Sequence, residues 1–387
     1  MKKIQNCMSR EKILFIATVE NHLLNFHIPF MKYFQDNGYE VHVATKLGER
    51  KGELEQYGMI CHDVNFSRSV NPLIALRVLM QLLKLMRENR FSLVHVHTPM
   101  ASFLGRVAAK LTHTKPVLYT AHGFHFYKGA PWYYWSFIYP AEYLAGKWTD
   151  GLIVMNQEDY INAQRMGFKP NKNLFLVHGV GVNLQQISNI SSIGNKIREE
   201  LGISDKDIVI SCIAELISRK NHIFLLKAWD KITQNSNNVH LLLVGNGSCL
   251  KYIKQQVKLN LLPRVYFLGY RKDVPQIIAK SDIVTLVSKH EGLPRSIMEA
   301  MALGKPVVVS NVRGNRDLVK QGGNGFLVEL GDVEGLSSSF KKLIDDAELR
   351  ANMGKVSLER IKEYVIEKVL IEMASIYDYY LKKNETF

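Results

Sequence analysis

Cysteine is scarce in this chain. Four cysteines occur among 387 residues, at Cys7, Cys61, Cys212 and Cys249, with no C-x-x-C pair and no Cys/His grouping at zinc-site spacing. This scatter predicts neither a disulfide framework nor a zinc motif. We therefore expect reduced, mostly packed thiols in a cytosolic protein, with no part in catalysis.

Long apolar runs and basic runs are also missing. No uninterrupted apolar stretch reaches the roughly 18–20 residues that span a bilayer. The Met-Lys-Lys start is not followed by the apolar region and cleavage site of a signal peptide, so none is expected. There is no run of five basic residues and no nucleic-acid-binding motif, so nucleic acid is not an expected partner.

Positive charge is nevertheless in excess. The formal net charge is +14 and the isoelectric point is about 9.4, which calls for an acidic partner. We expect an anionic membrane surface together with phosphate-bearing substrates. The alternative is a basic protein without such a partner.

Length and hydrophobic pattern indicate two domains of the same kind. A chain of 387 residues, 47% of them hydrophobic, exceeds one simple core. Apolar strands alternate with helices in both halves, which predicts parallel sheets covered on both faces. We place the domain boundary at residues 179–183, before a polar stretch over residues 185–195. The predicted strands are residues 12–18, 40–44, 91–97, 117–120, 152–155, 173–177, 208–214, 239–244, 265–268, 283–287 and 306–310, and the helices of the first half are 26–37, 75–89 and 101–111.

Residues 290–306 carry the most informative pattern. Glu291 follows a predicted buried strand, and Glu299 lies eight positions later, about two turns along a predicted helix that Pro294 suits at its start. N–H groups at such a helix start attract phosphate, while carboxylates accept from hydroxyls. A nucleotide-sugar offers both. The alternative is a surface ion pair between Arg295 and Glu299, although Glu299 is the only charge within residues 297–303.

In their context, Glu291 and Glu299 resemble the E-x7-E signature of the retaining glycosyltransferases of family four. The resemblance continues through residues 307–311 and 322–328, and residues 121–129 resemble a bacterial subgroup that builds exopolysaccharide, capsule or O-antigen. It implies an α/β fold of the GT-B type, with two Rossmann-like domains facing an interdomain cleft. We expect an acceptor-binding domain over residues 1–182, onto which a terminal helix over residues 366–387 packs, and a donor-binding domain over residues 183–365.

The resemblance also implies the cations of the donor site. Lys220 matches the family lysine that grips the donor pyrophosphate, where a cation neutralises the leaving diphosphate. The family arginine is replaced by Glu215, and Arg219 is a candidate for partial compensation because guanidinium suits bidentate phosphate contacts. The alternative is that Arg219 and Lys220 only cap a helix from solvent.

Other site residues are assigned in the same way. His122 matches the family histidine near the donor sugar and is expected to assist transfer, not to act as a nucleophile; a structural histidine at a strand end is its alternative. Arg271 either approaches the base or is a surface cation. Glu291 is expected to contact sugar hydroxyls and Glu299 the ribose. The full set is His122, Glu291 and Lys220 as catalytic residues, Arg219, Lys220, Gly292, Leu293, Pro294, Glu299 and Arg271 for the donor, and Glu20, Asn21, His22 and the undecided His125 for the acceptor.

Two segments of the first half are candidates for a membrane surface. Residues 70–90 form an apolar predicted helix with four basic residues, and residues 132–139 are rich in aromatic side chains. For each, the alternative is packing against the sheet.

Together these features predict a sugar transferase. We expect retaining transfer of a hexose or N-acetylhexosamine from a UDP-sugar to an undecaprenyl-diphosphate-linked saccharide, at the cytoplasmic face of the plasma membrane. Because none of the predicted site segments contains a D-x-D motif, we expect no metal and no cofactor. The alternatives are an isomerase that resembles UDP-N-acetylglucosamine 2-epimerase, and a non-catalytic scaffold subunit, for which Glu215 is the support.

Overall fold

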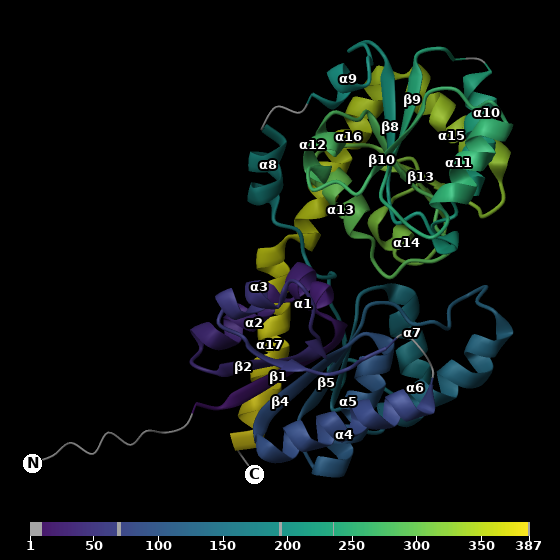
Figure 1. The fold of residues 1–387 in the computed structure, drawn as a ribbon. Coiled ribbons are helices and arrows are strands. Elements are labelled where there is room, and N and C mark those ends of the chain that lie inside the picture. Colours follow the sequence, from purple (N-terminus) through teal and green to yellow (C-terminus); the bar gives the residue numbers. More distant parts are fainter. Residues whose placement is uncertain (1–9, 68–70, 193–195, 235, 386–387) are drawn as a thin grey trace, which may run out of the picture. The chain divides into compact units, whose positions relative to one another are not determined.

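The computed structural model describes residues 10–67, 71–192, 196–234 and 236–385, which form two compact units (Figure 1). Unit 1 comprises Met1–Val180 and Val369–Phe387, and unit 2 comprises Gly181–Lys368. The sequence placed these limits at residues 182 and 366. Cys7 and Val70, used in the sequence analysis, lie outside the described residues.

Unit 1 is built on a seven-stranded parallel sheet in the order β3-β2-β1-β4-β5-β6-β7. Its central strands are apolar because helices cover both faces; Ile13, Leu14 and Phe15 of β1, for example, are fully buried. Of these strands, only β3 was not predicted. The strands are β1 (Lys12–Val19), β2 (Glu40–Lys46), β3 (Ile60–Asp63), β4 (Phe91–His97), β5 (Val117–Ala121), β6 (Gly151–Val154) and β7 (Leu174–Leu176).

The helices of unit 1 differ from the prediction where the chain leaves β1. The expected single helix over residues 26–37 is wrong at its start, because α1 begins directly after β1 and a break at His27 separates it from α2. Pro29, near the start of α2, lacks the N–H that a continuous helix needs. The helices are α1 (Glu20–Phe26), α2 (Ile28–Asp36), α3 (Lys51–Gln56), α4 (Pro72–Glu88), α5 (Pro99–Thr112), the π-helical turn η1 (Tyr134–Ile138), α6 (Tyr139–Gly146) and α7 (Gln157–Arg165).

Unit 2 repeats this architecture with a six-stranded parallel sheet in the order β10-β9-β8-β11-β12-β13. Its strands are β8 (Ile208–Ile213), β9 (Val239–Val244), β10 (Val265–Gly269), β11 (Ile283–Leu286), β12 (Val307–Ser310) and β13 (Gly325–Val328), the last not predicted. Its helical segments are α8 (Leu184–Ser192), α9 (Ile197–Glu200), η2 (Ser218–Lys220), α10 (His222–Thr233), α11 (Leu250–Leu259), α12 (Val274–Ala279), α13 (Arg295–Ala302), α14 (Asn315–Leu318), α15 (Val333–Asp345), α16 (Ala347–Ile361) and η3 (Lys362–Tyr364).

The polar stretch after the predicted boundary is mostly helical. Residues 185–195 were read as a polar stretch at the domain boundary, yet α8 runs to Ser192, and Ile187 is buried in the core of unit 2. Residues 193–195 lie outside the described part.

The last helix, α17 (Ile366–Glu385), contributes side chains to unit 1. Tyr377 is fully buried and its hydroxyl lies 3.0 Å from Nδ1 of His95. Tyr380 donates to the carbonyl of Asp150 at 2.6 Å. These contacts attach the end of the chain to β4 and to the segment before β6.

Within the described ranges, no helix has both the length and the apolar character needed to cross a membrane.

Candidate functional site

Both sheets have a position where the strand order reverses, between β1 and β4 in unit 1 and between β8 and β11 in unit 2. In open parallel sheets, ligands bind outside the carboxyl ends of the strands at this topological switch point. The segments that follow these four strands are therefore the first places to look for a site.

At the switch point of unit 2, one carboxylate holds two cations. Glu291, in the loop after β11, is buried, and its Oε1 lies 2.6 Å from Nζ of Lys220. Its Oε2 accepts from Nη1 of Arg219 at 3.2 Å. Both cations come from η2, in the segment after β8. The structure thus brings together three residues that the sequence selected separately.

The loop after β11 is fastened to its neighbours through backbone groups. The N–H of Lys289 donates to the carbonyl of Arg219 at 2.8 Å, and the buried Arg313 donates from Nε to the carbonyl of Glu291 at 2.9 Å. Gly314 has a φ of 76°, and a Cβ there would lie 2.4 Å from the carbonyl oxygen of Gly292. Only glycine permits this approach. Sequence reasoning missed both residues, because Arg313 binds a backbone carbonyl and Gly314 acts by lacking a side chain, and no motif displays either role.

The ionisation of Glu291 follows from its partners. Burial acts to raise its pKa, but the charges of Lys220 and Arg219 outweigh burial and hold the pKa below its usual range. Glu291 is therefore a carboxylate at neutral pH. Two cations and one carboxylate leave this group with one net positive charge, which suits an anionic ligand.

Glu299 forms the ion pair with Arg295 that was the alternative prediction for these two residues. Arg295 donates from Nε to Oε1 of Glu299 at 2.9 Å, so the i,i+4 ion pair is present. Burial raises the pKa of Glu299 although Arg295 opposes this. Pro294 is the N-cap residue of α13, and Glu299 is only the fifth residue of that helix, not two turns along it.

Two other residues of unit 2 also bear on the predicted donor site. Arg271 donates from Nε and Nη2 to both carboxylate oxygens of Asp273, at 2.8 and 2.6 Å, which is the surface-cation arrangement. Glu215, at the position of the expected arginine, has an exposed side chain. Arg219, not Glu215, is the residue that joins Lys220 at Glu291.

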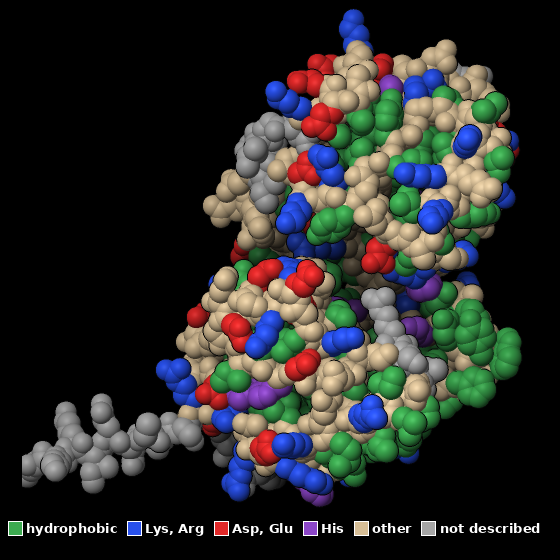
Figure 2. All heavy atoms as spheres, viewed as in Figure 1, with side chains coloured by type: hydrophobic (Ala, Val, Ile, Leu, Met, Phe, Trp, Pro, Cys, Tyr) green, Lys and Arg blue, Asp and Glu red, His purple; other side chains and the backbone are tan. Residues whose placement is uncertain are grey.

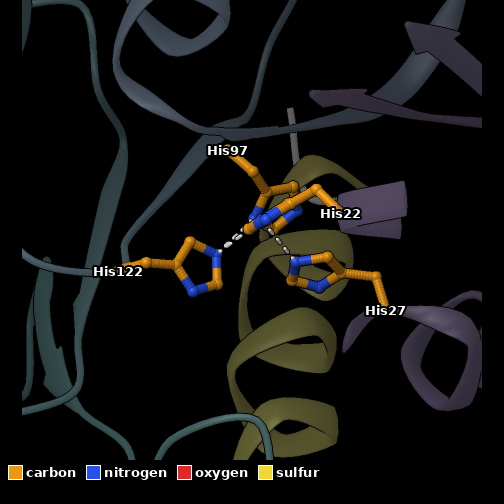
Figure 3. Close-up of side chains that lie close together, drawn as sticks. All are labelled: His22, His27, His97 and His122. Atoms are coloured by element: carbon orange, nitrogen blue, oxygen red, sulfur yellow. Dashed lines mark hydrogen bonds between the residues drawn. The ribbon is translucent and has the colours of Figure 1, made fainter. Parts of the chain in front are cut away.

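At the switch point of unit 1, four histidines converge: His22 of α1, His27 between α1 and α2, His97 at the end of β4, and His122 after β5 (Figure 3). Nε2 of His22 lies 3.1 Å from Nε2 of His122 and 3.2 Å from Nε2 of His27. Nε2 of His122 lies 3.4 Å from Nδ1 of His97. We call these four residues the histidine cluster.

Burial keeps the histidine cluster uncharged. It lowers the pKa of His22 to about 4, and burial followed by the neighbouring imidazoles lowers the pKa values of His27, His97 and His122 well below the ordinary value. His27 and His97 were not among the predicted site residues. His97 is visible as a strand-end residue, whereas the position of His27 depends on the break between α1 and α2.

The remaining predicted acceptor residues are spread around α1 and η1. Glu20 is buried, and its two carboxylate oxygens accept from the backbone N–H groups of Gly48 and Arg50 at 2.7 and 3.0 Å. Asn21 accepts from Arg50 at 2.8 Å. The ring of His125 packs edge-on against Tyr134, 5.6 Å between centroids. The structure therefore places His22, but not these three residues, in the histidine cluster.

The sequence matches two family models, "Glycosyl transferase 4-like" over residues 12–155 and "Glycosyl transferases group 1" over residues 194–360. It is 33% identical to the putative glycosyltransferase EpsD of Bacillus subtilis, over 96% of this chain and 97% of that protein. It is 30% identical to the UDP-Gal:alpha-D-GlcNAc-diphosphoundecaprenol alpha-1,3-galactosyltransferase of Escherichia coli, over 74% and 73% of the two chains. The fold resembles that of Anabaena HepE in complex with UDP and glucose, with a TM-score of 0.79 and 23% identity, covering 96% of this chain and 100% of that one. The predicted GT-B fold is thereby confirmed.

Proposed function

The chain belongs to the group 1 glycosyltransferases, and from that premise we propose that it transfers a hexose or N-acetylhexosamine, with retention, from a UDP-sugar to an undecaprenyl-diphosphate-linked saccharide. The product would serve bacterial surface-polysaccharide synthesis. The observation that carries this proposal is the Lys220–Arg219–Glu291 group at the switch point of unit 2. The substrate class is supported by the Escherichia coli relative, whose name specifies a UDP-sugar donor and a diphosphoundecaprenol acceptor.

In this proposal the cations of η2 bind the donor diphosphate. Lys220 is the less exposed of the two, with 13% of its side chain accessible against 34% for Arg219. A cation held in place before the reaction stabilises charge that develops on the leaving phosphate without reorganising. Arg219 then supplies the second positive charge in place of the arginine that Glu215 replaces.

The acids of unit 2 receive different parts of the donor. Glu291 orients the cations and accepts from sugar hydroxyls, while the backbone of Gly292, Leu293 and Pro294 approaches the phosphates. Glu299 accepts hydrogen bonds from the ribose hydroxyls. Arg295 then gives up part of its ion pair with Glu299. We propose that no metal is needed for transfer, since the two cations meet the charge of the diphosphate.

Unit 1 binds the acceptor in this proposal. His122 contacts a sugar hydroxyl through Nδ1, because Nε2 lies among the other imidazoles of the histidine cluster. Acceptor groups approach His22, Asn21 and His125 at the same end of the sheet. Glu20 contributes by holding the loop that contains Gly48 and Arg50.

We propose that one face of unit 1 rests on an anionic membrane. Along α4, exposed Leu73, Leu76 and Met80 lie on one side of the helix, with exposed Arg77, Lys84 and Arg87 beside them. The aromatic residues 132–139 fit both alternatives in part. Trp135 and Tyr139 pack on the core, whereas Trp132 and Phe137 are 72% and 67% exposed and are available to a membrane surface. Figure 2 shows hydrophobic side chains gathered over the η1–α6 region. Apolar groups flanked by cations suit a lipid interface.

A transfer assay tests the enzymatic proposal. The protein is incubated with undecaprenyl-diphosphate-linked saccharides and, one at a time, radiolabelled UDP-sugars. We expect one donor to label the organic extract, Glu291→Ala to abolish labelling, and the matched control Lys227→Ala, which changes an exposed lysine of α10, to retain it. The proposal is wrong if no UDP-sugar labels lipid. Retention is checked by the anomeric NMR coupling of the product.

Two further arms of the assay separate the alternatives. An epimer formed from UDP-N-acetylhexosamine alone would point to an isomerase, and loss of UDP binding in calorimetry would point to a scaffold. For the membrane surface, co-sedimentation with phosphatidylglycerol vesicles should fall in Leu73→Ser/Leu76→Ser and remain in Leu259→Ser, an exposed leucine of unit 2. Equal sedimentation of the two variants contradicts the proposed face.

A further inference from the structure

The nitrogen atoms of the histidine cluster are spaced as ligands of one metal ion. The nearest contacts along the series His27, His22, His122 and His97 are 3.2, 3.1 and 3.4 Å, and all four ligand atoms lie within 4.8 Å of one another. Four imidazole nitrogens at about 2.0–2.1 Å from a tetrahedral Zn²⁺ are about 3.3–3.4 Å apart. The three nearest separations match this geometry, and the remaining pairs, which reach up to 4.8 Å, would have to shorten on binding.

Hydrogen bonds alone do not satisfy this arrangement. Each imidazole nitrogen has one in-plane site, which holds either a proton or a lone pair. Nε2 of His22 has two nitrogen neighbours, and so does Nε2 of His122. One in-plane site pairs well with one partner, so the three contacts cannot all be good hydrogen bonds at once. A cation among the four nitrogens accepts all four lone pairs.

The outer nitrogens of the two inner rings, which do not take part in the cluster contacts, are also unsatisfied. Within the described residues, Nδ1 of His27 and Nε2 of His97 are buried without a hydrogen-bond partner. Burying such atoms costs free energy, so His27 and His97 are not held in place by hydrogen bonds as an ordinary core histidine is. Nearby His95, in contrast, has both nitrogens partnered, Nε2 by Thr120 at 2.7 Å and Nδ1 by Tyr377 at 3.0 Å. His95 is a satisfied core histidine, and the cluster members are not.

We propose that His22, His27, His97 and His122 bind one divalent transition-metal ion, with Zn²⁺ as the best fit. Four imidazoles without a carboxylate suit zinc and neighbouring transition metals, whereas Mg²⁺ and Ca²⁺ require oxygen ligands. The buried, neutral rings present lone pairs, as metal ligation requires. His22 and His122 are partly exposed, so an ion can enter from their side, while His27 and His97 close the inner side.

The ion explains why the cluster is assembled from four separate segments. It would join α1, the α1–α2 break, β4 and the segment after β5 at the switch point of unit 1. It would also fix the ring of His122 while leaving Nδ1 directed elsewhere. The inference does not rest on the proposed sugar transfer, because ion binding is measured without any substrate.

Cobalt substitution tests the proposal on the full chain. The protein is dialysed against a chelator, freed of it, and titrated with Co²⁺, which absorbs strongly in the visible range only in tetrahedral sites. We expect the band to saturate at one equivalent and to disappear when Zn²⁺ is added. A weak octahedral spectrum, or no saturable band, would overturn the proposal.

Matched variants locate the site. His22→Gln should lower the Co²⁺ affinity more than about a hundredfold, beyond the loss typical of a residue that only supports a ligand. His62→Gln should leave it unchanged, because His62 also contacts a histidine, Nδ1 of His42 at 2.8 Å, but belongs to no group of three or more possible metal ligands among the described residues. His122→Gln repeats the measurement if His22→Gln does not keep the wild-type circular dichroism. Equal affinity in the cluster and control variants would place the ion elsewhere and refute the assignment.

Discussion

In unit 1 the strand order reverses between β1 and β4, and in unit 2 between β8 and β11, so both sheets gather side chains at equivalent positions. In unit 2 the group there is charged, with Glu291 between Lys220 and Arg219. In unit 1 it consists of neutral imidazoles. In our proposals the topology sets where a ligand would bind and the side chains set its charge, which would be an anion at unit 2 and a cation or a hydroxyl at unit 1.

The largest effect is expected from removing the buried cation of unit 2. Lys220→Met should lower kcat/KM for transfer about 10²–10³-fold, the range for loss of one preorganised group that stabilises developing charge. Lys220→Arg keeps the charge and should lose less. Steady-state kinetics of both variants, with Lys227→Met as the control, measure this. If kcat/KM fell equally in Lys220→Met and Lys227→Met, the cation at the switch point of unit 2 would have no special role, and the contrast in charge between the two switch points would have no functional meaning.

Glu291→Gln should destabilise unit 2 by about 2–3 kcal/mol at pH 7, because it leaves a largely buried lysine without its counter-charge. The folded pKa of Glu291 is lowered, so its stabilising contribution is complete above the unfolded pKa and is lost as the pH falls through the folded value. The difference between wild type and variant should therefore shrink below pH 4.5. Urea unfolding followed by the fluorescence of Trp229, buried in unit 2, measures it. A constant difference would contradict the ion-pair account.

Glu299→Gln should show the opposite dependence on pH. The pKa of Glu299 is raised, so the folded state binds its proton more tightly than the unfolded state and wild type gains stability as the pH falls. The variant should match or exceed wild type by up to about 1 kcal/mol at pH 7, since the exposed Arg295 partner contributes little. This advantage should disappear at acidic pH. Urea unfolding across the same pH range measures this difference. If the stability of the two variants changed with pH in parallel, the two acids would be in similar environments.

The smallest effect concerns the histidine that lies beside the cluster without belonging to it. Tyr377→Phe removes the hydroxyl that contacts His95 and should cost about 1 kcal/mol, while Co²⁺ binding stays unchanged. Tyr252→Phe, on an exposed tyrosine of unit 2, is the control for thermal unfolding. A loss of Co²⁺ affinity in Tyr377→Phe would mean that His95 takes part in the cluster.

Local patterns predicted much of the fold. The run before Glu291 is β-branched and apolar, so β11 and the following turn and helix were recognisable, as were most other strands. β3 was missed because none of its residues is buried and its second half is polar, and β13 because it begins with a glycine and its two middle residues are only partly buried. The break between α1 and α2 was missed because Pro29 fits within the first turn of a helix, so its presence near residue 26 was compatible with one helix that begins there.

The candidate site was predicted in part. Glu291 and Lys220 were selected by motif, and the structure joins them. The ribose-binding role of Glu299 stays a prediction, and in the structure Glu299 also forms the alternative ion pair with Arg295. Motif reasoning assigned no site role to His27 or to His97, although His97 ends a predicted strand, since no sequence spacing relates residues that come from a helix break and from a strand end.

The sequence by itself determined the class of the chain and its two parallel α/β units, and it selected the acids and cations that we propose for a nucleotide-sugar site, because periodicity and motifs are local properties. Only the tertiary structure decided which of these residues meet. Residues 71 positions apart form the Lys220–Glu291 pair, and residues 100 positions apart form the His22–His122 contact. Such distances depend on strand order and on the packing of helices against the sheet, which no short stretch of the chain encodes.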